Sequence, residues 1–350
     1  MKKLFKSAAI LGLAFASLSA CQPNGSAESS SSSSSSPAVT YTYSNPLIAH
    51  DFADPYVYRA DDGYFYAYAT EGAVARSEDM VEWEDIDKLD TPTWGTPGAK
   101  LWAPCLAKFG DTYNLYYALS TWGDPNPGIG VMVADSPAGP FTDMGELFDS
   151  NSSGVRNSID PDVFVDPATG KAYIIWGSFN GIWAWELNAE TGLGMIGDPV
   201  CIITSTAYEA PNMLIKDGIY YLFMSAGSCC EGENSTYNVQ VYTATSALGP
   251  YTKSPVGDAS WSGSILHQLP PGTVTSGSGP VTAIYGPGHS CVVQDDAGDY
   301  WLYYHGFLRR GVVQSTRILF MDKLLWTEDG YPYIEGYVPN LDEQAAPVID

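Results

Sequence analysis

Five stretches of the chain are rich in aromatic and aliphatic residues, and each stretch follows a small polar turn. They are residues 62–70 (DGYFYAYAT), 110–120 (GDTYNLYYALS), 169–178 (TGKAYIIWGS), 217–227 (DGIYYLFMSAG) and 297–306 (AGDYWLYYHG). Short runs rich in Tyr, Trp, Ile and Phe and bounded by Gly and Asp are typical of β-strands. No segment shows the apolar period of a long amphipathic helix. The pattern therefore predicts an all-β protein built from an internal repeat.

A short element precedes each of the five turns, and each element contains a proline. In chain order the elements are Ala53-Asp54-Pro55, Trp102-Ala103-Pro104, Ile159-Asp160-Pro161, Glu209-Ala210-Pro211 and Gly286-Pro287-Gly288-His289. A repeat of roughly 40 to 50 residues made only of strands and turns has the period of a β-propeller blade, in which four antiparallel strands surround a central channel. The sequence predicts a five-bladed β-propeller.

Several of these elements carry a titratable side chain. Equivalent positions of successive blades meet around the propeller axis, so we expect Asp54, Asp160, Glu209 and His289 to converge there. Glycosidic bond cleavage needs an acid that protonates the leaving oxygen and a carboxylate that acts on the anomeric carbon or on water. Single aspartates beside turns are usually structural. Their recurrence at one place in the repeat favours a glycosidase site.

The first forty residues differ in composition from the rest of the chain. Three lysines precede an apolar run within residues 1–20, and Leu18-Ser19-Ala20-Cys21 resembles the bacterial lipobox. We expect a signal peptide at residues 1–20, lipidation of Cys21, a serine-rich tether at residues 21–40 and a catalytic domain at residues 41–350. This predicts an exported lipoprotein, anchored by lipid alone on the periplasmic side or the cell surface. An ordinary cleaved signal is the alternative.

Charge and cysteine content restrict the partners. The formal net charge of −24 argues against nucleic acid, whereas a neutral polysaccharide would not be repelled. Five cysteines besides Cys21 do not have zinc-site spacing. The adjacent Cys229 and Cys230 form either a vicinal disulfide or two thiols on opposite faces of a strand, and the second interpretation is favoured.

Five motifs, in this order, resemble those of glycoside hydrolase family 43. They are Asn45-Pro46 with Ala53-Asp54-Pro55, then Leu101-Trp102-Ala103-Pro104, then Ser158-Ile159-Asp160-Pro161 with Trp176-Gly177-Ser178-Phe179, then Tyr208-Glu209-Ala210-Pro211, and Gly286-Pro287-Gly288-His289. Residues 228–237 (SCCEGENSTY) are similar to the endo-1,5-α-L-arabinanases of that family and their close relatives. The resemblance implies hydrolysis of α-L-arabinofuranosyl linkages in arabinan or another arabinose-containing plant polysaccharide, with inversion of configuration.

The resemblance also assigns a role to each acid. Asp54 is expected to be the general base, Glu209 the general acid, and Asp160 the carboxylate that positions the acid and tunes its pKa. Arg317 is expected close to the bound sugar. His289 is expected to bind a metal ion in the channel. Calcium prefers oxygen ligands, so it would be held there through water, and no organic cofactor is expected.

Three further residues are candidates for substrate binding. The flat indole of Trp102 suits the C–H face of a furanose, although packing between blades is the alternative. Asn157 and Ser178 are candidates for hydrogen bonds to the sugar. A monomer is the default oligomeric state.

Two positions depart from the pattern of endo-arabinanases. Ala53 stands where these enzymes usually have a histidine, as in exo-acting relatives, and Cys105 replaces an acidic residue. The alternatives are therefore an exo-acting α-L-arabinofuranosidase or a β-xylosidase. An alternative of another class is a lipid-anchored propeller that binds glycans without cleaving them, which would not need all three acids.

Overall fold

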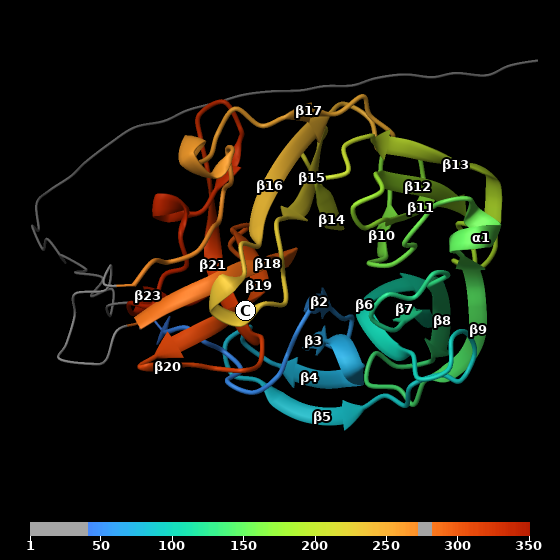
Figure 1. The fold of residues 1–350 in the computed structure, drawn as a ribbon, viewed down its shortest axis with the longest axis horizontal. Coiled ribbons are helices and arrows are strands. Elements are labelled where there is room, and N and C mark those ends of the chain that lie inside the picture. The colour runs from blue at the N-terminus through green and yellow to red at the C-terminus, as the bar shows by residue number, and fades with distance from the viewer. Residues whose placement is uncertain (1–40, 272–281) are drawn as a thin grey trace, which may run out of the picture. The chain divides into compact units, whose positions relative to one another are not determined.

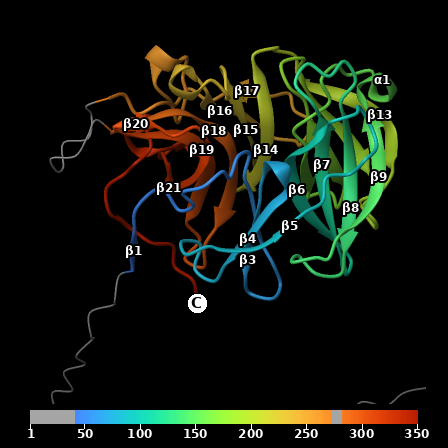
Figure 2. The same cartoon turned by 60° about the horizontal axis from the view of Figure 1, so that its bottom comes forward.

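The computed structural model describes residues 41–271 and 282–350. The expected signal peptide, lipidated Cys21 and tether lie outside these residues. In Figure 1 the described chain forms five antiparallel sheets that surround a central axis in the order of the sequence. Figure 2 shows the same ring turned by 60°, with the strands of each sheet fanning outward. The predicted all-β, five-bladed propeller is confirmed.

Four blades contain four strands and the last contains five. The first blade has β2 (Tyr56–Arg59), β3 (Phe65–Tyr68), β4 (Ala73–Ser77) and β5 (Glu84–Lys88), and the second has β6 (Lys100–Phe109), β7 (Thr112–Ser120), β8 (Gly128–Ala134) and β9 (Thr142–Asp149). The third has β10 (Asp162–Val165), β11 (Ala172–Trp176), β12 (Ile182–Leu187) and β13 (Met195–Ile203), and the fourth has β14 (Tyr208–Lys216), β15 (Ile219–Ala226), β16 (Asn238–Ala244) and β17 (Thr252–Lys253). The fifth has β18 (Thr282–Gln294), β19 (Tyr300–Arg310), β20 (Val312–Val313), β21 (Ile318–Trp326) and β22 (Pro332–Tyr333).

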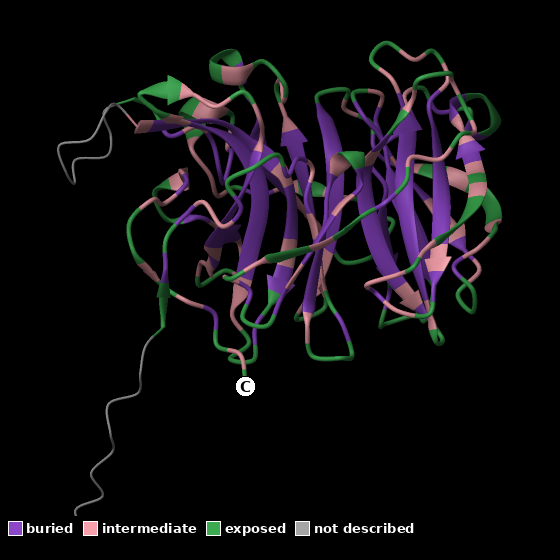
Figure 3. Cartoon of the chain, turned by 90° about the horizontal axis from the view of Figure 1, so that it is seen from below, coloured by how far each residue is buried: buried purple, intermediate pink, exposed green. Residues whose placement is uncertain are grey.

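Each aromatic run of the sequence forms the second strand of a blade, and its residues alternate between two hydrophobic clusters. In β11, Ile174 and Trp176 pack in the cluster between the second and third blades, whereas Tyr173 and Ile175 pack in the cluster between the third and fourth. Successive side chains of a strand point to opposite faces. Because each blade lies between two others, both faces of its second strand are buried. This explains why the aromatic runs do not alternate between apolar and polar residues. Figure 3 shows buried residues along the strands and exposed residues in the connections.

Helices contribute little to the described chain. The α-helix α1 (Ser150–Ser153) has four residues and follows β9. Within residues 41–271 and 282–350, no helix has the length and hydrophobicity needed to cross a lipid bilayer.

The first and last described segments close the ring together. Strand β1 (Thr42–Tyr43) pairs with β23 (Gln344–Ala345). Next to β1, the buried Asn45 binds the fifth blade: its amide donates to the Met321 carbonyl at 2.8 Å, and its side-chain oxygen accepts from the Met321 N–H at 2.9 Å. The amide also donates to the Asn340 carbonyl at 2.9 Å. One side chain thus joins the start of the chain to two segments of its end.

We expect Asn45→Ala to lower the free energy of unfolding by about 1–3 kcal/mol, because it leaves buried backbone groups without partners. The measurement is the urea midpoint of the purified protein. Thr42→Ala is the control, since Thr42 makes an exposed hydrogen bond to Glu343 in the same closure. Equal midpoints for the two variants would contradict the role assigned to Asn45.

Candidate active site

The proline element of every blade adopts the same unusual backbone. One non-glycine residue in each has a positive φ: Asp54 (54°), Ala103 (43°), Asp160 (58°), Ala210 (51°) and His289 (50°). In β6, β14 and β18 these residues lie at shifts of the strand register, as in a β-bulge. Such backbone costs about 1–3 kcal/mol per residue and persists only where the surrounding structure enforces it. The bulges turn side chains toward the propeller axis.

This register corrects one expectation from the sequence. Asp54, Asp160 and His289 occupy equivalent positions, but Ala210 and not Glu209 is their counterpart in the fourth blade. Glu209 lies one residue earlier and is equivalent to Trp102. The position of the prolines in the sequence already marks this difference, since Asp54 and Asp160 directly precede a proline whereas Glu209 stands two residues before one.

The expected convergence nevertheless occurs. Asp54, Asp160, Glu209 and His289 line one cavity of about 950 Å³, together with Arg317 and residues from all five blades. Asp160 and Glu209 are each only 7% exposed, so their carboxyl groups lie deep in the cavity. The structure brings into one site acids that belong to three different blades of the propeller.

One guanidinium, two imidazoles and a hydroxyl group surround the Asp54 carboxylate. Arg317 Nη1 contacts Oδ1 at 2.6 Å, and the Nδ1 atoms of His289 and His305 lie 3.3 Å from the same oxygen. The Thr70 hydroxyl donates to Oδ2 at 2.5 Å. Burial alone would raise the pKa of Asp54, but Arg317, the two histidines and Thr70 outweigh it and hold this pKa well below its usual range. Asp54 is therefore ionised at neutral pH.

The other two acids show the opposite shift. Burial is the main cause that raises the pKa of Glu209 and of Asp160. Repulsion by Glu209 raises the pKa of Asp160 further, whereas hydrogen bonds from Ser178 and Tyr237 partly offset the rise for Glu209. The Ala210 N–H donates to Asp160 Oδ2 at 3.2 Å. The cavity thus holds an ionised carboxylate across from a pair of acids that retains a proton more strongly than ordinary carboxyl groups do.

Comparison with known proteins identifies the family. Residues 43–332 match the glycosyl hydrolases family 43. The chain belongs to this family. Its members are inverting glycosidases, and the chain is a family 43 enzyme.

Two curated proteins and one solved structure illustrate the similarity. The enzyme is 26% identical to the extracellular endo-α-(1→5)-L-arabinanase of Thermotoga petrophila, over 79% of this chain and 69% of that protein. It is 27% identical to the extracellular exo-α-(1→5)-L-arabinofuranosidase of Cellvibrio japonicus, over 81% of this chain and 86% of that protein. The crystal structure of an exo-1,5-α-L-arabinanase from a bovine ruminal metagenomic library matches with a TM-score of 0.64 and 27% identity, over 81% of this chain and 96% of that one.

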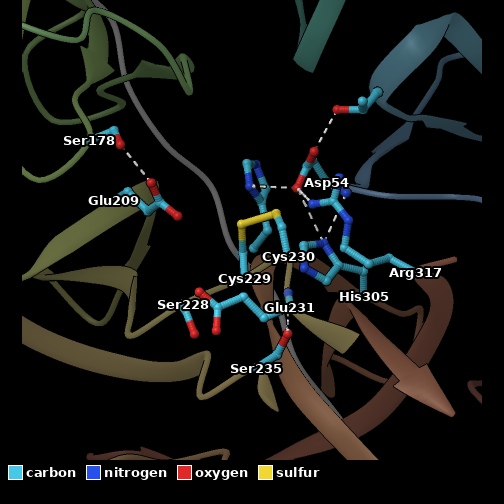
Figure 4. Close-up of a disulfide and its surroundings, with 12 residues drawn as sticks. Asp54, Ser178, Glu209, Ser228, Cys229, Cys230, Glu231, Ser235, His305 and Arg317 are labelled. Atoms are coloured by element: carbon cyan, nitrogen blue, oxygen red, sulfur yellow. Dashed lines mark hydrogen bonds and ion pairs between the residues drawn. A yellow bond between two sulfur atoms is a disulfide. The ribbon is translucent and has the colours of Figure 1, made fainter. Parts of the chain in front are cut away.

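The sequence suggested Asn157 and Ser178 as sugar ligands. In this family 43 enzyme Asn157 bonds to Ser178, and Ser178 bonds to the acid Glu209. The Asn157 amide donates to Ser178 Oγ at 2.9 Å. The Ser178 hydroxyl donates to Glu209 Oε2 at 2.6 Å (Figure 4). Both residues line the cavity, as does the half-buried Trp102, which is outside the clusters between blades. Their direct contact with a sugar stays a prediction.

Sequence reasoning missed Thr70 and Tyr237 and left His305 without a role. The Asp54 N–H donates to His305 Nδ1 at 3.0 Å, and His305 is fully buried. The Tyr237 ring stacks on His305 at 5.7 Å between ring centroids, while its hydroxyl bonds Glu209. This stacked pair connects Asp54 with Glu209. Two features of the sequence could have pointed to these residues: Thr70 ends an aromatic run, and Tyr237 lies in the arabinanase-like stretch.

The exposed aromatic residues of the cavity were also missed. Trp122, in the connection between β7 and β8, is 81% exposed, and Phe179, between β11 and β12, is 39% exposed. Both line the cavity beside the acids. Aromatic side chains left open to solvent in a cavity of this kind suit stacking on sugar rings.

Few side chains near His289 could bind the expected calcium ion directly. His289 Nδ1 faces Asp54, and no group of three or more His, Cys, Asp or Glu side chains within the described chain is arranged to hold a metal ion. Calcium needs several oxygen ligands, so these residues do not form a protein cage for it. Calcium held through water stays a prediction.

The interpretation of Cys229 and Cys230 as two free thiols on a strand was wrong. They form a disulfide and lie in the connection between β15 and β16. Both half-cystines line the cavity. Cys105, Cys201 and Cys291 are free.

Gly288 provides the space for Tyr237. A Cβ atom at Gly288 would lie 2.3 Å from Tyr237 Cδ1, so a side chain there would displace the ring. We expect Gly288→Ala to destabilise the protein by about 1–3 kcal/mol, as overpacking does. Thermal or urea unfolding measures the loss.

A double-mutant cycle with Tyr237→Ala is the control for this prediction. The double variant should lose less stability than the two single losses added together, because the clash disappears when the ring is removed. Additive losses would show that Gly288 and Tyr237 do not interact in this way.

Proposed function

We propose that the protein hydrolyses α-1,5-linked L-arabinofuranosyl residues within arabinan, as an endo-arabinanase that inverts configuration. The opposed pKa shifts of Asp54 and Glu209 across one cavity carry this proposal. A general base must be ionised and a general acid protonated at the same pH. The arabinan-cleaving relatives of both types supply the substrate class.

Each acid then has one task. Glu209, whose pKa is raised, donates its proton to the glycosidic oxygen of the departing sugar, and Asp54 accepts a proton from the water that attacks the anomeric carbon. The Ser178 hydroxyl orients the Glu209 carboxyl group, and Arg317 fixes that of Asp54. Asp160 adds a second buried acid, and repulsion by Glu209 raises the pKa of Asp160, so ionisation of both acids is disfavoured.

The shape of the cavity supports cleavage within the polymer. Exposed Trp122 and Phe179 come from different blades and add stacking surfaces to that of Trp102, so the cavity can hold more than one sugar unit. The buried Ala53 in place of a histidine favours the second candidate, an exo-acting arabinofuranosidase, as in the Cellvibrio japonicus relative. The two differ in their first products.

The setting of the enzyme is part of the proposal. We infer export, as the names of the extracellular relatives and residues 1–20 suggest, and anchoring of a monomer through lipidated Cys21. Calcium near His289 is proposed through water only, and no step of the reaction depends on it.

Chromatography of products from linear 1,5-arabinan, sampled early, tests the mode of action. We expect arabino-oligosaccharides of mixed length, because an open cavity accepts internal linkages. Arabinose alone from the first sample would replace the endo proposal with the exo one. No product would favour xyloside hydrolysis or glycan binding without cleavage.

Glu209→Gln tests the acid itself. We expect kcat on arabinan to fall about 10²–10⁴-fold, since the amide has no proton to donate, while arabinan binding is largely kept. Glu190→Gln, at an exposed position outside the cavity, is the matched control and should keep full activity. A glycan-binding propeller would show altered affinity alone and no turnover in any form.

Tyr237→Phe tests the electrostatics. The Tyr237 hydroxyl lowers the pKa of Glu209, so its removal raises that pKa and leaves the acid protonated to higher pH. We expect the basic limb of the kcat/KM profile to move to higher pH, while the acidic limb set by Asp54 stays in place. A basic limb that does not move, or moves down, would exclude Glu209 as the group that controls it.

A further inference from the structure

The Cys229–Cys230 disulfide is part of the wall of the active-site cavity. Both half-cystines line it together with Glu209 and Asp54, and in the view of Figure 4 the two sulfur atoms lie between those acids. Cys229 is partly exposed and Cys230 is exposed. A ligand in the cavity can therefore reach the disulfide, and so can a dissolved reductant.

The loop that carries the disulfide is held at both ends. The Thr236 N–H donates to the Ser228 carbonyl at 3.0 Å, and the Ser228 N–H donates to Thr236 Oγ1 at 3.1 Å. Inside this closure the Glu231 N–H donates to Oγ of Ser235, at 2.8 Å, and Ser235 is buried. The next residue after Thr236 is Tyr237, which bonds Glu209. The loop thus presents its sulfur atoms at a fixed place relative to the acid.

The disulfide differs chemically from the acids beside it. It carries no charge and no hydrogen-bond donor, whereas Glu209, Asp160 and Glu231 in the same wall are acidic. Sulfur is polarisable and makes favourable dispersion contacts with apolar surface. A furanose ring has such a surface on its C–H face. Two linked half-cystines offer one continuous apolar patch, while two separate thiols would rotate independently and donate S–H groups.

We propose that the Cys229–Cys230 disulfide is a substrate-contacting surface, which packs against an arabinofuranosyl unit of the chain bound next to Glu209. Reduction of the disulfide would then weaken the binding of the glycan and not the chemical step. This inference rests on the proposed arabinanase function. It makes affinity for the substrate depend on an oxidising environment, which is where disulfides persist.

The other three cysteines of the described chain lie outside the cavity. Cys105 and Cys291 are buried, Cys201 is partly buried, and none of the three lines the cavity. A dithiol such as dithiothreitol breaks the S–S bond by exchange: Cys229 and Cys230 gain two electrons and two protons as thiols, and the reductant becomes its cyclic disulfide. Any effect of mild reduction on arabinan binding therefore points to this pair.

The experiment measures kcat and KM on linear arabinan for four forms: oxidised wild type, wild type treated with dithiothreitol, the Cys229→Ser/Cys230→Ser double variant, and a Cys201→Ser control. We expect KM to rise about three- to tenfold in the reduced and double-variant forms, because one favourable contact with the substrate is lost. We expect kcat to stay nearly unchanged. Reoxidation should restore the wild type, the double variant should not respond to dithiothreitol, and the control should behave as wild type.

Three further measurements check affinity, folding and the state of the disulfide. Titration of arabinan into a Glu209→Gln variant, oxidised and reduced, gives the change in affinity without turnover, and unfolding midpoints show whether each form is folded. Mass spectrometry of the peptide that carries both cysteines should find it two hydrogens lighter in the oxidised protein. Free thiols in the oxidised protein would overturn the inference before any kinetics.

The kinetic outcomes separate the two proposals. Equal KM values in both redox states, with arabinan cleaved normally, would overturn the disulfide contact alone. A fall in kcat at constant KM would also overturn it, because the disulfide would then act through the position of Glu209. Oxidised wild type that neither binds nor cleaves arabinan would overturn the proposed function and this inference together.

Discussion

The structure depends on the burial of every blade between two neighbours. Each aromatic second strand divides its side chains between two clusters, so no blade can bury its apolar residues unless the ring closes. Closure in turn depends on contacts between the ends of the described chain, with Asn45 bonded to Met321 and Asn340. The hydrophobic effect supplies the drive for this arrangement, and buried hydrogen bonds fix where the ring is joined.

The central site follows from that closure. Each innermost strand has a residue with positive φ within it or just before it, a conformation that an isolated strand would not keep. Packing of five blades holds it, and Asp54, Asp160 and His289, which adopt it, line one cavity. Packing between the blades thus supplies the stability that holds the strained backbone at the axis.

Neighbouring charges give the carboxyl groups of the site different protonation states. Asp54 and Asp160 are aspartates at equivalent positions, partly buried and buried, yet Arg317 contacts Asp54 at 2.6 Å, while Glu209 repels Asp160. One carboxylate stays ionised and the other pair retains a proton. The difference arises from neighbours supplied by other blades and not from the residue type.

The sequence by itself determined the number of blades, the strand content and the identity of the acids at the axis, because repeat period and proline elements are local patterns. Tertiary structure decided the rest. The fold brought Ser178 within hydrogen-bonding distance of Glu209, and Asn157 within hydrogen-bonding distance of Ser178. The pairing of Tyr237 with His305 and the orientation of the disulfide into the cavity also required the folded ring. These features depend on distances between segments far apart in the chain, which residue order alone does not specify.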